Sequence, residues 1–290
     1  MVLPVFNEAG HIRREVDRIR AALDASAYSY ELIVVDDGST DGSAEEIASL
    51  TGVRTIRFPR NRGSGSARKV GTRTARGRVV VWTDVDMSYP NEEIPALVKE
   101  LDGGWDQVVG ARTSEQGGQR AARVPAKWVL RKLASYLTET AIPDLNSGLR
   151  AFRRDVALQF LYLLPKGFSC VTTITMSFLA NGYSVGYVPI DYAPRSGRSK
   201  FHWWTDTRKY LLQIVRMVLL YNPLRVFGPP GSILLAVGLG KLGYDLAAHS
   251  FHVAADTIVL LTVAVLVLVL GLLADLLVTL NKPREEVGPV

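Results

Sequence analysis

Two aspartates, Asp84 and Asp86, stand two positions apart in the segment TDVDMSYP, where the apolar run RVVVWT ends. Carboxylates so spaced at a strand end can converge through a turn on one hard cation, and Mg²⁺ or Mn²⁺ favours such oxygen ligands together with diphosphate oxygens. A cation held there would act as a Lewis acid and neutralise charge developing on a departing diphosphate. We therefore expect a Mg²⁺ or Mn²⁺ site on these two residues; a solvated turn is the alternative.

Polar side chains also follow three other apolar runs. Asn7 and Glu8 follow VLPVF, Asp36 and Asp37 follow ELIVV, and Arg112 follows WDQVVGA. In an open parallel sheet, ligands bind beyond the carboxyl ends of the strands. We therefore predict that these residues meet the two aspartates at one sheet edge, which is the candidate active site.

The runs alternate with helical patterns. Ile12, Val16, Ile19 and Leu23 fall on one face of a helix, and further helices are expected near 44–50 and 65–75, separated by the strands VRTIRF and RVVVWT. Such alternation predicts an α/β domain, a Rossmann-like and mostly parallel sheet with helices on both faces.

Two apolar segments follow near the C-terminus, at 232–250 and 257–280. The second exceeds the roughly 20 apolar residues that cross a bilayer. Lys241 and Asp245 interrupt the first, but they lie four apart on one helical face and can pair. We predict two transmembrane helices. A buried hairpin of a soluble protein is the alternative, although the Leu/Val run leaves no polar face for water.

Basic residues flank these spans on one side only. The connecting stretch FHVAAD has no Lys or Arg, whereas six basic residues lie beyond the outer ends: Arg208, Lys209, Arg216, Arg225, Lys282 and Arg284. The positive-inside rule then places the N-terminal domain and the C-terminal tail in the cytoplasm, on the inner face of the cell membrane. The segment 205–227 mixes basic and apolar residues, and we expect an amphipathic helix in the headgroup layer that Pro223 and Pro229 interrupt. A helix packed on the catalytic domain is the alternative.

The composition narrows the function classes. The net charge of +6 suits phosphate ligands, anionic lipid or nucleic acid, but no aromatic or helix-turn-helix motif supports nucleic-acid binding. One cysteine, Cys170, excludes an intrachain disulfide, and no Cys/His cluster has zinc-ligand spacing.

Four motifs, PVFNE, VVDDGSTDGS, NRGSGSARKVG and TDVDMSYP, occur here in an order and spacing that resembles the family 2 glycosyltransferases. The later segments DLNSGLRAFRR and APRSGRSK resemble those of dolichyl or polyprenyl phosphate sugar synthases, and the resemblance covers about residues 1–200. It implies a GT-A fold and an inverting enzyme that uses a GDP- or UDP-linked sugar. Compared with the family, the first strand lacks several residues ahead of Met1, so we expect the native start upstream.

The resemblance also assigns roles to residues. The donor would be bound by Pro4, Phe6, Asn7, Glu8, Asp36, Asp37, Lys69 and Asp84. Asn61, Arg68 and Lys69 begin a helical region that suits either phosphate contacts or a solvated basic face. Ser88 stands where related synthases have a metal-binding Gln, and we include it with Asp84 and Asp86. Asp144 resembles an acceptor-loop element of the family, and a turn cap is the alternative.

The segment in which we would expect a catalytic base for the acceptor contains no carboxylate. Family members that glycosylate sugar hydroxyls carry a catalytic ED pair near the segment that here reads FSCVTTITMSFLANGY, which has no Asp or Glu. A hydroxyl needs a base to remove its proton, whereas a phosphate monoester, with a second pKa of about 6, is already ionised. Guanidinium groups match phosphate oxygens. We predict acceptor-phosphate binding by Arg112, Arg131, Arg195, Arg198, Ser199 and Lys200, and catalytic roles for Asp86, Arg112 and Arg195; each arginine by itself also suits a surface charge.

The predicted organisation is a GT-A domain at 1–200, interfacial helices at 201–230, two transmembrane helices at 231–280 and a cytoplasmic tail at 281–290. The predicted activity is sugar transfer from a nucleotide sugar to undecaprenyl or dolichyl phosphate at the bilayer, with a homo-oligomer compatible with the sequence. The alternatives are a transferase acting on a lipid-linked sugar or another hydroxyl, and a scaffold that binds nucleotide sugar without activity.

Overall fold

The computed structural model describes residues 1–113, 140–167, 169–193, 222–248 and 253–281, with single residues at 132, 135, 212, 215, 216 and 219. It divides the chain into two compact units, Met1–Gln213 and Ile214–Val290. Five predicted acceptor residues lie outside the described residues: Arg131, Arg195, Arg198, Ser199 and Lys200. Most of the predicted interfacial segment 201–230 does so as well, up to residue 221.

The first unit is built on one mixed sheet. Over the described residues it has seven strands in the order β3-β2-β1-β4-β6-β5-β7. Their bounds are β1 Val2–Val5, β2 Leu32–Asp36, β3 Val53–Arg57, β4 Val79–Trp82, β5 Gln107–Arg112, β6 Arg150–Arg153 and β7 Val185–Ile190. Of these strands, only β6 runs antiparallel to its neighbours β4 and β5, so the predicted mostly parallel sheet is confirmed. The carboxyl ends of β1, β2, β4 and β5 therefore share one edge.

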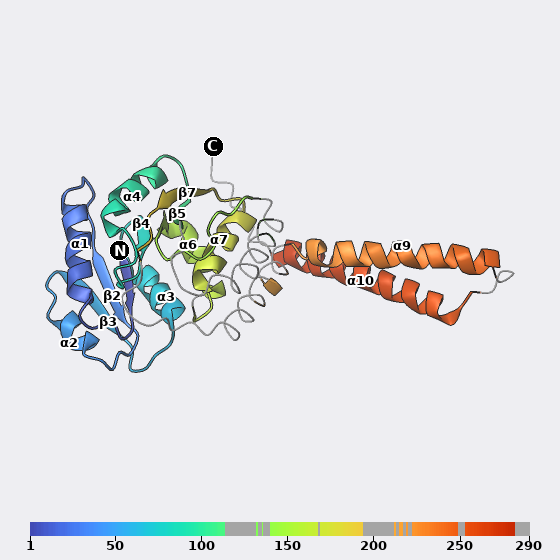
Figure 1. Cartoon of the computed structure of the whole chain (residues 1–290), viewed down its shortest axis with the longest axis horizontal. Coiled ribbons are helices and arrows are strands. Elements are labelled where there is room, and N and C mark those ends of the chain that lie inside the picture. The colour runs from blue at the N-terminus through green and yellow to red at the C-terminus, as the bar shows by residue number, and fades with distance from the viewer. Residues whose placement is uncertain are drawn as a thin grey trace. The chain divides into compact units, whose positions relative to one another are not determined.

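Helices cover both faces of the sheet (Figure 1). One face packs against α1 (Ile12–Asp24), α2 (Ser43–Ala48) and α4 (Ile94–Asp102), which follows the short 3-10 helix η1 (Asn91–Glu93). The other packs against α3 (Ser64–Thr74), α6 (Arg154–Phe160), η2 (Leu161–Leu163) and α7 (Cys170–Ala180). The strands β1, β2, β4 and β5 are almost wholly buried between two apolar layers, as parallel strands in α/β domains are, whereas the edge strand β3 is partly exposed.

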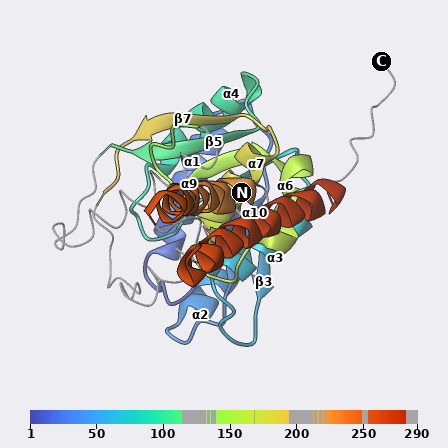
Figure 2. The ribbon, with the colours of Figure 1, turned by 90° about the vertical axis from the view of Figure 1, so that its right-hand side faces the viewer.

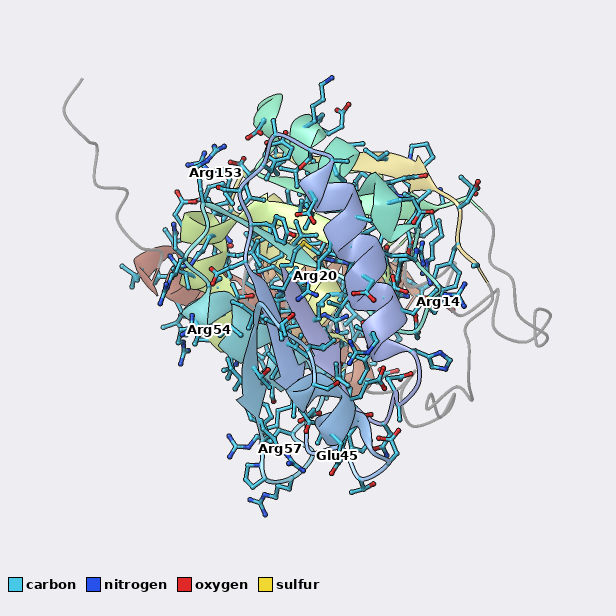
Figure 3. The ribbon with its side chains drawn as sticks, turned by 90° about the vertical axis from the view of Figure 1, so that its left-hand side faces the viewer. Arg14, Arg20, Glu45, Arg54, Arg57 and Arg153 are labelled. Carbon is cyan, nitrogen blue, oxygen red and sulfur yellow. The ribbon has the colours of Figure 1, made fainter. Side chains whose placement is uncertain are left out.

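Helix α1 shows why the layers form. Ile12, Val16, Ile19 and Leu23 are all buried, as their spacing predicts. Each such side chain stabilises the fold by about 1.5–3 kcal/mol relative to an exposed one. Figure 3 shows α1 lying across the strands, with the charged side chains of β3, Arg54 and Arg57, at the sheet's outer edge. Charges on an edge strand disfavour pairing with another chain.

The second unit is a helical hairpin, in which α9 (Leu224–Ala248) and α10 (Ala255–Asn281) lie side by side (Figures 1 and 2). Both helices are long and apolar enough to cross a membrane. Small or buried residues recur every seven positions along α9 at Gly231, Gly238 and Asp245, and a Cβ at Gly238 would lie 2.6 Å from Leu261. Close helix approach at small residues is typical of membrane helix pairs.

The structure tests two predictions for the hairpin, the Lys241–Asp245 pair and the interruption at Pro229. Lys241 and Asp245 do pair, at 3.7 Å, and the Lys241 ammonium also contacts Asp256 at 2.9 Å. The expected interruption at Pro229 is wrong, because Pro229 and Pro230 lie inside α9. In a helical pair within lipid, neighbouring groups and local adjustment tolerate proline where a short soluble helix would end.

Candidate active site

A pocket opens at the carboxyl edge of the sheet. Residues from the ends of β1, β2 and β4, the start of α3 and the loop before α7 line it: Pro4, Val5, Phe6, Glu8, Asp37, Asn61, Gly63, Ser64, Asp84, Val85, Asp86 and Gly167. Of the predicted donor residues, the structure brings Pro4, Phe6, Glu8, Asp37 and Asp84 together here. Asn7, Asp36 and Lys69 are not among the lining residues.

Asn7 holds two loops together. Its backbone N–H donates to Ser39 Oγ at 3.1 Å, and its side-chain oxygen accepts from the Thr40 N–H at 2.9 Å. Its φ of 53° lies in the left-handed region, which asparagine tolerates better than most residues. Glu8 N–H donates to Ser43 Oγ at 2.9 Å. These bonds set the exit direction of β1 and hence the position of the neighbouring Glu8 in the pocket wall.

The two aspartates after β2 differ in environment. Asp37 accepts the backbone N–H groups of Arg62 at 2.6 Å and Gly63 at 2.8 Å, so it ties the loop before α3 to the pocket. Burial raises the pKa of Asp37, and those two hydrogen bonds oppose the rise. Asp36 is 1% exposed, caps the Ser39 N–H and pairs with Arg57 at 3.2 Å. Asp36 thus joins the loop after β2 to β3 and does not line the pocket.

The DxD turn presents two unequal carboxylates. Asp84 is 27% exposed and pairs with Arg68 Nη2 at 2.5 Å. Asp86 is 1% exposed and accepts both the N–H, at 3.2 Å, and the hydroxyl of Ser88. Met87, with φ of 62°, completes the turn. Ser88 therefore orients Asp86, while a direct metal contact of Ser88 remains a prediction.

The donor set suits a cation shared with substrate. Within the residues that the structure describes, no group of three His, Cys, Asp or Glu side chains is placed to hold a metal by itself. Two carboxylates, Asp84 and Asp86, do line one pocket. Mg²⁺ is typically held by one or two carboxylates, with substrate phosphates and water completing its shell. The site fits such a cation.

A buried network beneath the turn was missed by sequence reasoning. The Thr83 hydroxyl donates to Asn91 Oδ1 at 2.7 Å, and the Asn91 amide donates to Glu15 of α1. Glu15 is fully buried, and burial raises its pKa. Glu15 stands beside Ile12, Val16 and Ile19 on the apolar helix face. A lone acid at such a position was the signal that a polar partner would lie opposite.

Arg112 lies at the end of β5 in a bidentate ion pair. Its Nε and Nη2 donate to the two carboxylate oxygens of Asp144 at 2.6 and 2.9 Å. Burial opposes ionisation of Asp144, but the bonds and charge of Arg112 hold the pKa of Asp144 below its usual range. The guanidinium also stacks 5.2 Å from the ring of Tyr192. Arg112 therefore carries a charge that the loop from Asp144 already partly compensates.

The loop after Asp144 and the chain after β7 both reach the DxD turn. The Gly148 N–H donates to the Tyr89 hydroxyl at 2.6 Å, and a Cβ at Gly148 would lie 2.7 Å from Asp84 Oδ2. The Ala193 N–H donates to the Ser88 carbonyl at 2.9 Å. Ala193 is the first residue of APRSGRSK, so this basic segment starts beside the predicted cation site.

Two further predictions concern α3 and α7. The Lys69 ammonium donates to the Leu164 carbonyl at 3.1 Å, and burial lowers the pKa of Lys69. A donor contact of Lys69 stays a prediction. Helix α7 contains no Asp or Glu, and its Cys170 Sγ lies 3.9 Å from Arg68 Nη1. The helix thus begins next to the residue that holds Asp84, and it brings no carboxylate there.

Comparisons with known sequences match both units. The Glycosyl transferase family 2 model matches residues 1–160, and the GtrB C-terminal hairpin model matches residues 222–280. Undecaprenyl-phosphate 4-deoxy-4-formamido-L-arabinose transferases are similar: the Edwardsiella ictaluri protein is 30% identical, over 82% of this chain and 73% of its own length. The Pseudomonas fluorescens protein is 34% identical, over 82% and 70%. The dodecaprenyl-phosphate galacturonate synthase of Rhizobium johnstonii is 25% identical, over 100% and 90%.

A solved structure shares the fold. Glucosyl-3-phosphoglycerate synthase from Mycobacterium tuberculosis, in complex with Mn²⁺, uridine diphosphate and phosphoglyceric acid, has a TM-score of 0.60 with this chain. The sequences are 22% identical, and the match covers 75% of this chain and 77% of the other. The likeness identifies the first unit as a GT-A domain.

Proposed function

Because the chain belongs to glycosyl transferase family 2, we propose that it transfers a sugar, with inversion, from a nucleotide-sugar donor to a polyprenyl phosphate at the cytoplasmic face of a membrane. The product is a polyprenyl-phosphate sugar. The similar proteins named for undecaprenyl- and dodecaprenyl-phosphate support this acceptor class. So does the hairpin, whose helices are long and apolar enough to lie beside a polyprenyl chain.

One observation carries the acceptor assignment. The segment FSCVTTITMSFLANGY, near which the family resemblance would place an ED pair in enzymes that act on hydroxyls, contains α7. This helix has no carboxylate, and its first residue lies against the buried guanidinium of Arg68. A hydroxyl nucleophile would lack a base there. A phosphate monoester arrives ionised and needs cations that position it. Arg112, Arg131, Arg195, Arg198, Ser199 and Lys200 are our candidates for that role.

The donor would lie in the pocket between Glu8, Asp37 and the DxD turn. Carboxylates there accept hydrogen bonds from base and ribose. We assign Asp84 and Asp86 to a divalent cation, Mn²⁺ or Mg²⁺, which when bound polarises the donor diphosphate as a Lewis acid. Ser88 keeps Asp86 oriented through its hydroxyl and N–H. The donor sugar is UDP- or GDP-linked.

The reaction is one in-line displacement. An oxygen of the acceptor phosphate attacks the anomeric carbon, and the bond from that carbon to the donor diphosphate breaks. The nucleoside diphosphate leaves with the bonding electrons, and no proton is transferred. The protein's task is therefore alignment and charge compensation, which proximity in a fixed site makes effective.

The test uses the full chain reconstituted in vesicles that contain undecaprenyl phosphate or dolichyl phosphate. Radiolabelled UDP- and GDP-sugars are offered one at a time with Mn²⁺ or Mg²⁺, and lipids are extracted with organic solvent. We expect label in the organic phase only when both polyprenyl phosphate and the matching donor are present. Label found on free alcohols or lipid-linked sugars, with none on polyprenyl phosphate, would refute the proposal.

The orientation is tested separately. With both helices spanning, the turn between α9 and α10 faces outward and the catalytic unit faces the cytoplasm, because basic residues flank only the outer ends of the pair. A cysteine introduced at Ala254 should react with a membrane-impermeant maleimide from outside intact cells. The buried native Cys170 should not react.

A further inference from the structure

Two arginines of the first unit are buried completely next to the candidate site. Arg68 of α3 is 2% exposed and Arg150 of β6 is 0% exposed. A guanidinium loses its hydration when it is buried, so a fold keeps one there only where hydrogen bonds or charges replace the water. The hydrogen-bond and ion-pair partners of both side chains therefore indicate which parts of the site each arginine keeps in place.

Arg68 holds the first carboxylate of the DxD turn. Its Nη2 donates to Asp84 Oδ1 at 2.5 Å, and its Nη1 lies 3.9 Å from Cys170 Sγ. The guanidinium carbon lies 5.7 Å from the ring centre of Trp82. Arg68 thereby ties Asp84 to α3, and its own guanidinium lies against the first residue of α7.

Arg150 holds the loop that follows Asp144. Its Nη2 donates to the Ser147 carbonyl, and its Nη1 donates to the Val171 carbonyl and, at 2.8 Å, to Thr175 Oγ1. In the part of the chain that the structure describes, no carboxylate forms an ion pair with Arg150. Its role there is to bind two carbonyls and a hydroxyl, which fastens the loop to α7.

Asp84, which Arg68 holds, and the loop that Arg150 holds meet at Gly148. A Cβ on this residue would lie 2.7 Å from Asp84 Oδ2, so only a hydrogen fits between the loop and the carboxylate. Cys170 and Val171, which contact the two arginines, are adjacent in the first turn of α7. Asp84 is thus linked through Arg68 to the first turn of α7. The same turn is linked through Arg150 to residues 147–148, which lie against Asp84.

We propose that Arg68 and Arg150 are paired positioning residues, which use the first turn of α7 as a common anchor. Arg68 sets the position of the cation-binding carboxylate Asp84, and Arg150 sets the loop 144–148 that faces the acceptor. The inference rests on the proposed function, because it assigns Asp84 to a cation and the loop to the acceptor side.

Lysine is the discriminating substitution at both positions. Arg68→Lys and Arg150→Lys keep the charge but replace a planar fork of donors with a single ammonium. In Arg68→Lys the ammonium could not reach both Asp84 and the α7 side as the fork does. In Arg150→Lys it could not serve the two carbonyls and the Thr175 hydroxyl together. Arg153→Lys is the matched control, since it makes the same exchange on β6 at a half-exposed arginine, whose partners are Asp106 and Asp155.

The experiment measures three quantities on the reconstituted full chain. Mn²⁺ binding is followed by electron paramagnetic resonance with UDP or GDP present, because the donor diphosphate completes the cation site. The KM for undecaprenyl phosphate comes from initial rates, and the melting temperature comes from a thermal unfolding scan. We expect Arg68→Lys to weaken Mn²⁺ binding by about tenfold, the low end of the loss seen when a partner of a metal ligand is replaced. We expect Arg150→Lys to raise the acceptor KM by about tenfold, a shift of some 1.4 kcal/mol, and to leave Mn²⁺ binding within about twofold. The control Arg153→Lys should change neither.

Two arginine variants that only lowered the melting temperature, with Mn²⁺ affinity and acceptor KM unchanged in the folded protein, would overturn the inference. If Arg150→Lys does not fold, Thr175→Val removes one acceptor of the same guanidinium and should raise the acceptor KM in the same direction; an unchanged KM counts against Arg150. Failure of the wild type to make any glycolipid would instead refute the proposed function. The Mn²⁺ measurement on Arg68→Lys would still decide the part that concerns Asp84.

Discussion

Replacing Gly148 with alanine tests how tightly the loop 144–148 and the DxD turn are packed. The added methyl group would lie 2.7 Å from Asp84 Oδ2 and 3.1 Å from the Tyr89 hydroxyl, whereas ordinary van der Waals contact begins at 3.4 Å. Asp84 or the loop must therefore move by about 0.7 Å, and a misplacement of about 1 Å near reacting groups can reduce a rate by about 10²-fold. We expect kcat/KM to fall by about that factor, equivalent to about 2.7 kcal/mol of transition-state stabilisation.

The assay is glycolipid formation in vesicles, with thermal unfolding measured in parallel. Gly110→Ala is the matched control, because its methyl group would meet Ile190 Cδ1 at 2.9 Å in the apolar layer and would not touch Asp84. Overpacking of this kind costs about 1–3 kcal/mol of stability. Both variants should melt at lower temperature, but only Gly148→Ala should lose turnover. Gly148→Ala with activity within about twofold of the Gly110→Ala protein would refute the packing argument.

The same contacts lead to three further expectations. Asp86→Ala should abolish transfer while a thermal scan still shows a folded protein, because Asp86 lies in the turn and not in a helix or strand; near wild-type turnover would remove it from the cation site. Asp144→Asn should lower stability at neutral pH by roughly 3 kcal/mol, since it leaves the charge of Arg112 without its partner. The folded-state pKa of Asp144 is depressed, so the stability that ionised Asp144 contributes is present above the unfolded pKa of about 3.9 and is lost as pH falls from there through the folded-state pKa. Unfolding scans at several pH values should show the two proteins converge in acid, and a constant gap would contradict this assignment. Gly238→Leu should separate α9 from α10, because even a Cβ there lies 2.6 Å from Leu261; loss of a disulfide between cysteines engineered across the pair reports it, and retention of that crosslink would exclude the effect.

The fold was largely predictable because the strands and α1 obey simple patterns. Five strands and three helices of the first 112 residues coincide with the predicted elements. The strands β1, β2, β4 and β5 are apolar runs because the α/β layers bury them on both faces. Strand β6 was not predicted: RAFR is four residues long and places Arg150 in the interior. A pattern of polarity cannot identify a strand whose inward side chain is a buried arginine, because the hydrogen bonds that satisfy it come from α7.

The residues that line the candidate site were predictable from the sequence, whereas the hydrogen-bond and ion-pair partners of its charged side chains were not. Strand ends brought Glu8, Asp37, Asp84 and Asp86 to one pocket, as parallel topology requires. Asp36, one residue from Asp37, instead pairs with Arg57. The register of β2 against β3 places Asp36 opposite Arg57, and the sequence alone does not give that register. The partners of Arg112 and Glu15 likewise come from segments 32 and 76 positions away.

The absence of a base on α7 is linked to the charges around its first turn. Arg68 lies beside Cys170, and Arg150 binds the Val171 carbonyl. A carboxylate introduced on this turn would stand near two guanidinium groups, and nearby opposite charges favour its ionised form. A carboxylate with a lowered pKa is a poor proton acceptor. The two arginines that we propose to position Asp84 and the loop 144–148 therefore disfavour a general base on this turn, and they favour a nucleophile that is already an anion.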